Sequence, residues 1–161
     1  MAAIVYHEPF KTFRFLVEVE GGGTSVVAAF TQFSGVKMQV DVVAARSGAE
    51  HRGVQDHVPA LTKFDEVTLK KGVIGDNEFL DWILSSAPGA TEAPTGKNKY
   101  RTINVVALDE KGKRGITWSL INALPVAYEL APMDGSQSAV LSETMVFAIT
   151  GFKRVTRPEN G

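Results

Sequence analysis

The sequence contains no cysteine, which excludes disulfide bonds, thiol nucleophiles and zinc sites with cysteine ligands. It also lacks an excess of charge, because 17 Lys and Arg stand against 18 Asp and Glu, a formal net charge of -1. The basic footprint of a nucleic-acid-binding protein is therefore missing. No run of about 18 apolar residues occurs, and the start, MAAIVYHEPFK, has no signal-peptide pattern. We expect a soluble chain, synthesised in the cytoplasm, without a membrane span.

The length indicates one domain over residues 1–161, large enough to bury roughly 70% of the surface of its unfolded form. Two polar stretches interrupt it. Residues 46–57, RSGAEHRGVQDH, predict a long exposed loop or an extended hairpin tip, and residues 88–99, PGATEAPTGKNK, predict a flexible surface loop. Residues 156–161 are expected to form a frayed C-terminal tail.

The clearest local pattern changes from strand to helix. Val67 and Leu69 alternate with polar residues and predict a strand over residues 63–71. After two glycines the apolar spacing becomes helical and predicts a helix over residues 76–84, with Asp76 as the N-cap.

The predicted helix has one apolar side. Phe79, Leu80 and Ile83 are expected to pack on the body of the subunit, because they share one face at a spacing of three to four residues. Asp81 is then turned away, and Trp82 lies at the edge of the apolar face. The helix is therefore expected to cover the body with one side and to expose the other.

Alternating apolar residues predict about seven strands in all. Residues 13–20 and 26–33 form a hairpin around a triple glycine, and residues 36–43 form a strand with one buried face. Residues 103–108 and 116–120 flank a charged turn at Gly112, with Trp118 facing the core; residues 124–130 and 141–152 complete the set. The pattern favours a mainly β fold, a β-sandwich or open barrel of antiparallel strands with one short α-helix.

No catalytic or cofactor site is predicted. His51 and His57, with Glu50 and Asp56 beside them, are residue types that bind zinc or iron, but their spacing fits no compact metal site, so a solvated loop is favoured. The serines form no G-x-S-x-G motif. We therefore expect no enzyme activity, no metal and no cofactor, and a structural or binding role.

Four segments together resemble a known family. They are PFKTFRFLVEVEG, AFTQFSGV, LTKFDEVTLKKGVIGDNEFLDWI, and WSLINALPVAYELAPMDGSQSAVLSETMVFAITGFKRV, and they span residues 9–155. The chain is similar in them to the tail tube proteins of contractile phage tails and of phage-tail-like contractile injection systems. The L-x-K-x-x-x-V-T-L-K-K-G-V segment before a Trp-containing helix and the W-x-L-x-N-A-x-P-V-x-Y segment are specific in combination.

This resemblance implies a structural subunit of an inner tube. Six copies would form a ring, and stacked rings would join their sheets into a continuous β-barrel around a lumen. Sheath contraction would drive the tube through a target envelope. The implied partners are further copies of the chain, the sheath protein outside, baseplate and terminator proteins at the ends, and cargo, a toxin protein or DNA, in the lumen. The subunit would thus belong to an assembled particle: a virion tail, a tailocin, or an extracellular or cell-anchored injection system.

The resemblance also implies where contacts lie. The segment at residues 46–57 would reach the neighbouring ring, and Asp81 would lie towards the sheath. The candidate inter-ring residues are Arg46, Glu50, His51, Arg52, Gln55, Asp56 and His57. Two alternatives stay open: a baseplate-proximal paralogue that initiates the tube, and a β-sandwich ligand-binding module or enzyme.

Overall fold

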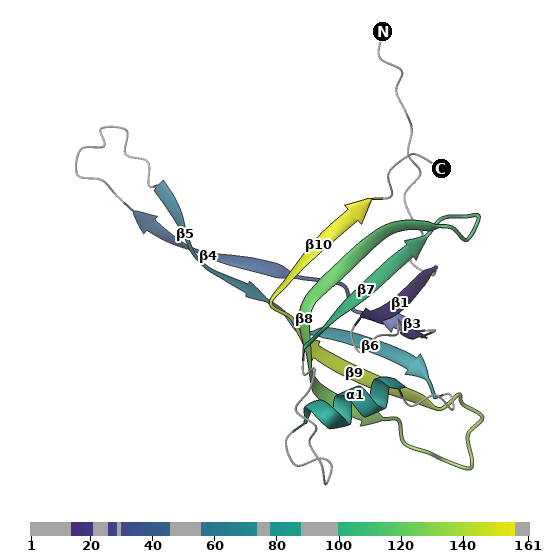
Figure 1. The fold of residues 1–161 in the computed structure, drawn as a ribbon. Helices are drawn as coiled ribbons and strands as arrows, with labels where there is room; N and C mark the ends of the chain where they lie inside the picture. The colour runs from purple at the N-terminus through teal and green to yellow at the C-terminus, as the bar shows by residue number, and fades with distance from the viewer. Residues whose placement is uncertain are drawn as a thin grey trace.

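The computed structural model describes residues 14–20, 26–28, 30–45, 56–73, 78–87 and 100–156. Within them the chain forms ten strands and one helix (Figure 1). The mainly antiparallel β fold with one short helix, predicted from the alternating pattern, is confirmed. The elements are β1 (Phe15–Glu20), β2 (Val26–Ala28), β3 (Phe30–Phe33), β4 (Met38–Ala45), β5 (Asp56–Phe64), β6 (Val67–Gly72), α1 (Glu78–Ser86), β7 (Arg101–Leu108), β8 (Arg114–Leu130), β9 (Ser142–Ala148) and β10 (Gly151–Thr156).

Strand β8 holds the main sheet together. The sheet has the order β2-β1-β7-β8-β9-β6-β3, and β10 also pairs with β8. The first part of β8 lies between β7 and β10, whereas its second part pairs with β9. The sheet therefore folds over along β8, and its two halves face each other across the core (Figure 1).

The length of β8 differs from the prediction. Residues 116–120 and 124–130 were expected as separate strands, but they form one strand of 17 residues. Asn122 adopts a φ of 52°, and the pairing with β9 shifts by a bulge between Pro125 and Ala127. Asn tolerates this left-handed conformation better than most residues, and a bulge accommodates a proline that cannot donate to the ladder. The irregularities at Asn122 and Pro125 therefore lie inside one continuous strand.

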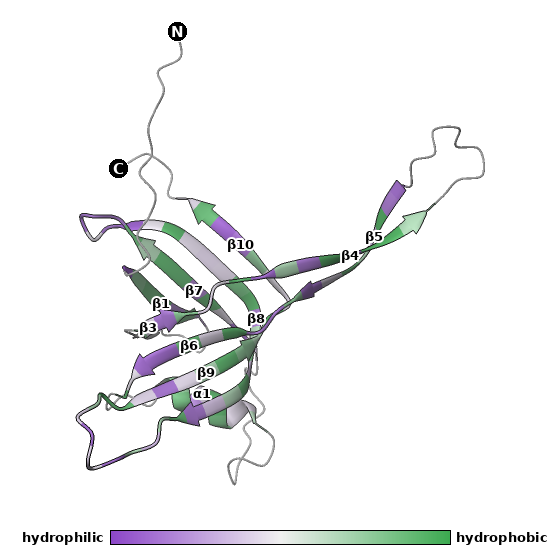
Figure 2. Ribbon diagram, turned by 180° about the vertical axis from the view of Figure 1, so that it is seen from behind, coloured by the Kyte–Doolittle hydropathy of each residue, from purple (hydrophilic) through white to green (hydrophobic). Residues whose placement is uncertain are grey.

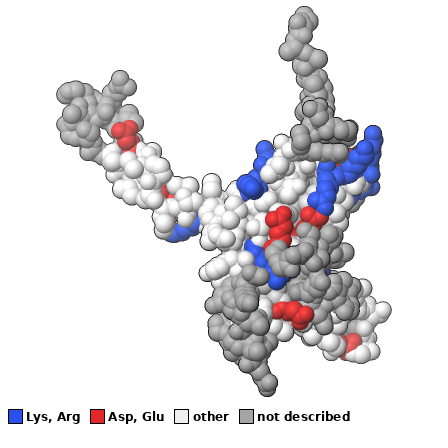
Figure 3. All heavy atoms as spheres, in the orientation of Figure 1, with Lys and Arg blue, Asp and Glu red and all other residues white. Residues whose placement is uncertain are grey.

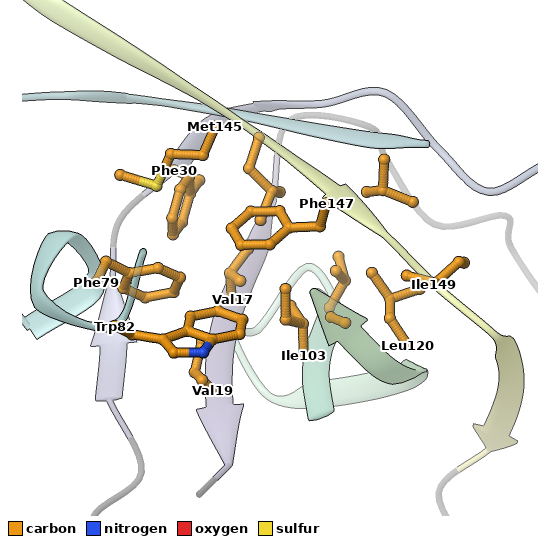
Figure 4. Close-up of a cluster of buried hydrophobic side chains, with 14 of the residues drawn as sticks. Val17, Val19, Phe30, Phe79, Trp82, Ile103, Leu120, Met145, Phe147 and Ile149 are labelled. Atoms are coloured by element: carbon orange, nitrogen blue, oxygen red, sulfur yellow. The ribbon is translucent and has the colours of Figure 1, made fainter. Parts of the chain in front are cut away.

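The core lies between the two halves of the sheet and beneath α1. Val17, Ile103 and Leu120 come from one half, and Leu69 and Phe147 from the other; all five are fully buried. Figure 4 shows Phe79 and Trp82 of α1 pointing into this cluster. The Trp82 and Phe147 rings stack at a centroid distance of 5.3 Å, and Phe79 meets Phe30 edge-on at 5.2 Å. Each such pair contributes about 0.5 to 1.5 kcal/mol beyond simple burial.

The helix begins and ends later than residues 76–84. It spans Glu78–Ser86, and the proposed N-cap Asp76 lies outside the described residues. Ser85 and Ser86 lie in its last turn, and their hydroxyls donate to the Trp82 carbonyl at 2.9 and 2.8 Å, so they satisfy an acceptor of that turn. Trp82 was placed at the edge of the apolar face, which is wrong, because its side chain is only 2% exposed.

Other strand boundaries also differ. The strand predicted over residues 63–71 is two strands, since β5 ends at Phe64 and β6 begins at Val67. Residues 26–33 likewise divide into β2 and β3. One strand was predicted over residues 141–152 and a frayed tail over residues 156–161, but the chain forms β9 up to Ala148 and a separate strand, β10, which pairs with β8. Residues 88–99 and 157–161 lie outside the described ranges.

The charged turn between β7 and β8 matches its prediction, because Gly112 has a φ of 75° and supplies the left-handed residue. Within the described ranges, no helix has the length and apolarity needed to cross a membrane.

Candidate assembly interface

Strands β4 and β5 form an arm that extends away from the rest of the subunit (Figure 1). They pair antiparallel from Met38 opposite Phe64 to Ala45 opposite Asp56, and among the described strands they pair only with each other. Residues 56 and 57 belong to β5, whereas residues 46–55 lie outside the described residues, so the long exposed loop or extended hairpin tip expected over residues 46–57 stays a prediction. A two-stranded ribbon has no second layer that could cover its faces, so its side chains stay accessible.

The surface of the arm is largely apolar. Val42, Val43, Val58 and Leu61 are between 48% and 57% exposed. Val43 and Val58 are cross-strand partners, and Val42 lies on the opposite face beside Pro59. Figure 2 shows hydrophobic segments along both strands, and Figure 3 shows few charges on the face of the arm that is turned to the viewer. The prediction of one buried face for residues 36–43 is wrong for the single chain, because both faces of β4 are accessible.

Two ion pairs lie near the base of the arm. Lys63 Nζ is 2.7 Å from the Asp41 carboxylate, and Lys37 Nζ is 3.2 Å from Asp65. All four side chains are well exposed, so each pair contributes at most about 1 kcal/mol. The ion pairs therefore link the two chain segments only near the base of the arm. The apolar side chains of its distal part stay exposed.

The candidate inter-ring residues are only partly described. Asp56 and His57 are exposed and begin β5, opposite Ala45 and Ala44. The remaining five lie outside the described residues: Arg46, Glu50, His51, Arg52 and Gln55. Their assignment to contacts between rings stays a prediction.

The helix residues occupy two environments. Phe79 and Ile83 are buried, at 3% and 6% exposure, and Leu80 is half-buried. Asp81 is exposed. The guanidinium of Arg101 lies 5.3 Å from the Trp82 ring centroid, a distance at which a cation is attracted to the ring face. The helix thus exposes Asp81 to solvent on one side and packs Phe79 and Trp82 into the core on the other.

A groove of about 520 Å³ opens between the β1-β7-β8-β10 half of the sheet and residues 31–36. Its walls are mostly apolar and include Phe15, Phe33, Val36, Trp118 and Phe152. Trp118 was expected to face the core, but it is half-buried and lines this groove. The alternating pattern correctly placed Trp118 on the inner face of its strand. It could not show that the space between the two halves of the sheet is open to solvent at this point.

Within the described ranges, no three His, Asp or Glu residues come close enough to hold a metal ion. The arrangement instead offers two apolar surfaces, one on the arm and one in the groove. Exposed apolar patches of this kind mark contacts with other proteins.

The family profile of the T4-like virus tail tube protein gp19 matches residues 11–153. No curated protein sequence matches the chain.

Similar solved structures share the fold at low identity. A chain of the anti-feeding prophage (AFP) baseplate, determined by cryo-EM with 6-fold symmetry, superposes with a TM-score of 0.73 at 19% identity, covering 94% of this chain and 98% of that one. A chain of the extended PVC sheath–tube complex, an extracellular contractile injection system, gives 0.72 at 22% identity, covering 92% and 93%. A chain of the AFP tube-terminating cap gives 0.73 at 23% identity, covering 97% of each.

The family match covers nearly all of the described strands and the helix, and the sequence resemblance to tail tube proteins is confirmed. The chain belongs to the T4-like virus tail tube protein gp19 family.

Proposed function

We propose that this protein is the inner-tube subunit of a contractile injection system or phage tail. Six copies form a ring, and rings stack into a hollow tube inside a sheath. Membership of the tail tube family supports this role. The similar fold of a chain from a sheath–tube complex supports it as well.

The arm is the observation that carries the proposal. Val42 and Val43 lie on opposite faces of β4, and both are more than half exposed. Burial of a Val or Leu side chain stabilises by about 1.5 to 3 kcal/mol relative to full exposure. An arm that exposes several such side chains is therefore completed by contact with other copies.

The sheet has edges that neighbouring copies can pair with. β2 and β3 end the order of the main sheet, and β10 has β8 as its partner among the described strands. Open edges are aggregation-prone unless they are covered or paired. Pairing between copies around a ring would close the sheets into a barrel and remove these edges.

The contact between the arm of one copy and a different surface of the next copy is of a kind that can produce a ring. An arm and a distant receiving surface are different patches, so their contact is head-to-tail. Head-to-tail contacts close into a ring when the rotation allows it, and a second set along the axis stacks the rings. In this assembly the segment at residues 46–57 reaches the next ring, and Asp81 of α1 faces the sheath.

The tube would be passive. Its ends bind baseplate and terminator proteins, its lumen carries a toxin protein or DNA, and sheath contraction drives it through the target envelope. A formal net charge of -1 fits a conduit that does not retain its cargo. We assign no catalytic activity, metal or cofactor to the subunit, in keeping with the structural role of its family.

A tube-initiating subunit at the baseplate is the second candidate. It is favoured by the similarity to a chain of the AFP baseplate, which superposes as well as the chain of the AFP cap does. An initiating subunit would form single rings and would not extend them into tubes.

Sedimentation velocity of the purified protein tests the self-association. The unmodified chain should sediment as rings and longer assemblies. A Val43→Asp variant places a charge on the arm and should remain monomeric, whereas Val140→Asp, at another exposed valine outside the arm, should assemble normally. Assembly of Val43→Asp to the same extent as the unmodified chain would contradict the role of the arm.

A further inference from the structure

We infer that the apolar groove is covered by the segment of the same chain that precedes β1, residues 1–13. This segment lies outside the described residues. The inference concerns the single subunit and does not depend on the proposed tube-forming role. The groove is bounded by Phe15, Phe33, Val36, Trp118 and Phe152.

The groove is an incomplete piece of core. Phe15, Phe33, Val36 and Phe152 are partly buried residues that pack against the main hydrophobic cluster. Trp118 is half-buried and lines the groove with them. The volume of about 520 Å³ lies in the range of about 300 to 1,000 Å³ that is typical of pockets filled by a ligand. The groove therefore has room for apolar side chains that would complete the core.

The described chain begins in the wall of this groove. Arg14 and Phe15 both line it. The Leu108 N–H donates to the Arg14 carbonyl at 3.0 Å, so Arg14 still belongs to the ladder between β1 and β7. The Arg14 guanidinium donates to the Glu110 carbonyl at 2.7 Å. Because consecutive Cα atoms are only about 3.8 Å apart, the segment before Arg14 starts at the rim of the groove.

The alternation of β1 directs the segment towards the groove. Val17 and Val19 are buried on the inner face of β1, and Phe15 lies on the same face and packs against the same cluster. Phe13 is the next position of this series in the sequence. Continued alternation would turn its side chain to the inner face, beside Phe15 and into the open part of the core.

The rest of the segment has a matching composition. It reads MAAIVYHEPFKT, with apolar residues at positions 4–6 and at Phe10 on either side of Pro9. Proline favours a turn, so the segment can reverse its direction over the groove. Thirteen extended residues span roughly 43 to 47 Å at about 3.3 to 3.6 Å per residue. The segment is therefore long enough to cross the groove and return.

The groove also offers partners for the backbone of an extended segment. β3 supplies Thr31, Gln32 and Phe33 to its wall. β3 ends the order of the main sheet, and among the described strands it pairs with β6 alone. Its other edge therefore presents N–H and C=O groups to which a segment lying in the groove can bond.

Connectivity favours this segment over an occupant from solution. A short flexible tether holds its segment at an effective concentration of about millimolar, and the segment is attached at the rim itself. The arm of the same copy is not an alternative, since Val36 lines the groove and β4, which begins at Met38, leads away from the body (Figure 1). With the groove covered, the arm remains as the exposed apolar surface of the subunit.

The absence of cysteine permits a test by disulfide cross-linking in the full chain. Lys11→Cys leaves the apolar residues of the segment in place and is combined with Gln32→Cys, an exposed position that lines the groove. The control combines Lys11→Cys with Lys113→Cys, an exposed position at the turn between β7 and β8 to which Arg14 is bonded. A disulfide forms only when the two Cα atoms come within about 7 Å of each other.

Mild oxidation is followed by electrophoresis without reductant and by counting the remaining thiols. The inference predicts an intrachain disulfide that forms several times faster for the groove pair than for the control pair, in assembled and unassembled protein alike. Equal rates for the two pairs would overturn it, because a segment that does not occupy the groove reaches both positions. Covalent multimers from the groove pair would show the segment of a second copy as the occupant and would also overturn it.

Quenching of tryptophan fluorescence by acrylamide gives a second measurement without cysteines. Trp82 is only 2% exposed, so quenching reports mainly on Trp118 in the groove. Phe10→Asp should uncover Trp118 and raise the quenching constant, whereas Thr12→Asp, which adds the same charge at a polar position of the segment, should leave it unchanged. Equal quenching of the two variants would contradict the inference. Neither measurement requires tubes, so failure of the chain to assemble would reject the proposed function and leave this inference standing.

Discussion

Lys71 and Glu143 form an ion pair in the interior of the subunit, with Nζ 3.1 Å from Oε1 and side chains only 3% and 8% exposed. They are direct cross-strand partners of β6 and β9. The Tyr128 hydroxyl donates to the other oxygen of Glu143 at 2.7 Å, and Lys71 Nζ lies 5.6 Å from the Phe79 ring centroid. The pair therefore joins the sheet to the underside of α1 and selects one register between two apolar strands.

Removal of one partner should be far more harmful than removal of both. Glu143→Gln leaves the Lys71 ammonium buried without a counter-charge, and we expect a loss of about 3 to 5 kcal/mol in the free energy of unfolding. The double variant Lys71→Met, Glu143→Leu replaces the pair by apolar groups and should be close to the original stability. Urea unfolding of the unassembled subunit gives both values. A Glu143→Gln midpoint equal to that of the unmodified chain would contradict the buried pair.

Tyr128 should make stability depend on pH in the alkaline range. Partial burial, the hydrogen bond to Glu143 and the charge of Glu143 raise the pKa of Tyr128 from 10.0 to about 12. Between these values the unfolded chain loses the phenolic proton and the folded chain keeps it, so stability falls as pH rises from about 10 to about 12. Melting temperatures across this range should fall less steeply for Tyr128→Phe. Identical slopes for the two proteins would argue against a raised pKa.

Phe79 should be essential for folding of the subunit. It is 3% exposed and contacts both Phe30 and Trp82. Phe79→Ala should cost about 3 to 5 kcal/mol and prevent accumulation of folded subunit. Asp81→Ala on the exposed side of the same helix serves as the control and should change stability by no more than about 0.5 kcal/mol. A soluble, native-like Phe79→Ala protein would show that the buried face is not required.

The charges of the inter-ring segment should matter for assembly and little for folding. Changing Glu50, Arg52 and Asp56 together to Ser should leave the circular dichroism and melting of the single subunit nearly unchanged. Tubes seen by electron microscopy should become shorter or disappear, because ion pairs partly buried between rings would lose a partner. Tubes of normal length and salt resistance from this variant would reject the assignment of residues 46–57.

Local alternation was enough to predict the β class and the helix. Val67 and Leu69 share a face, and both are fully buried. The same alternation places Lys71 on that face, but a lysine is normally exposed, so the sequence analysis did not predict its buried ion pair with Glu143. The pairing of β6 with β9 places Glu143 directly opposite Lys71 and supplies the counter-charge. The position of Lys71 in the strand, rather than its charge, therefore determines its burial.

The exposed apolar surfaces of the arm and of the groove were harder to predict from the sequence than the strands and the helix. The apolar pattern of β4 was taken to mean a buried face, because within one chain apolar alternation normally reports burial. In a protein that assembles, the same pattern also reports surfaces that copies cover for each other. Trp118 illustrates the complementary case, since it lies on the inner face of its strand but lines an open groove. Whether an inner face is closed depends on the distance between the two halves of the sheet, which no local pattern contains.

Negative-stain electron microscopy of the purified, unmodified protein tests the central claim most directly. The account predicts rings with six-fold symmetry and an open centre that stack into tubes as concentration rises. Single rings without stacking would favour the tube-initiating subunit. Discrete monomers at every concentration and salt condition would contradict the assignment of this chain as a tube-forming subunit.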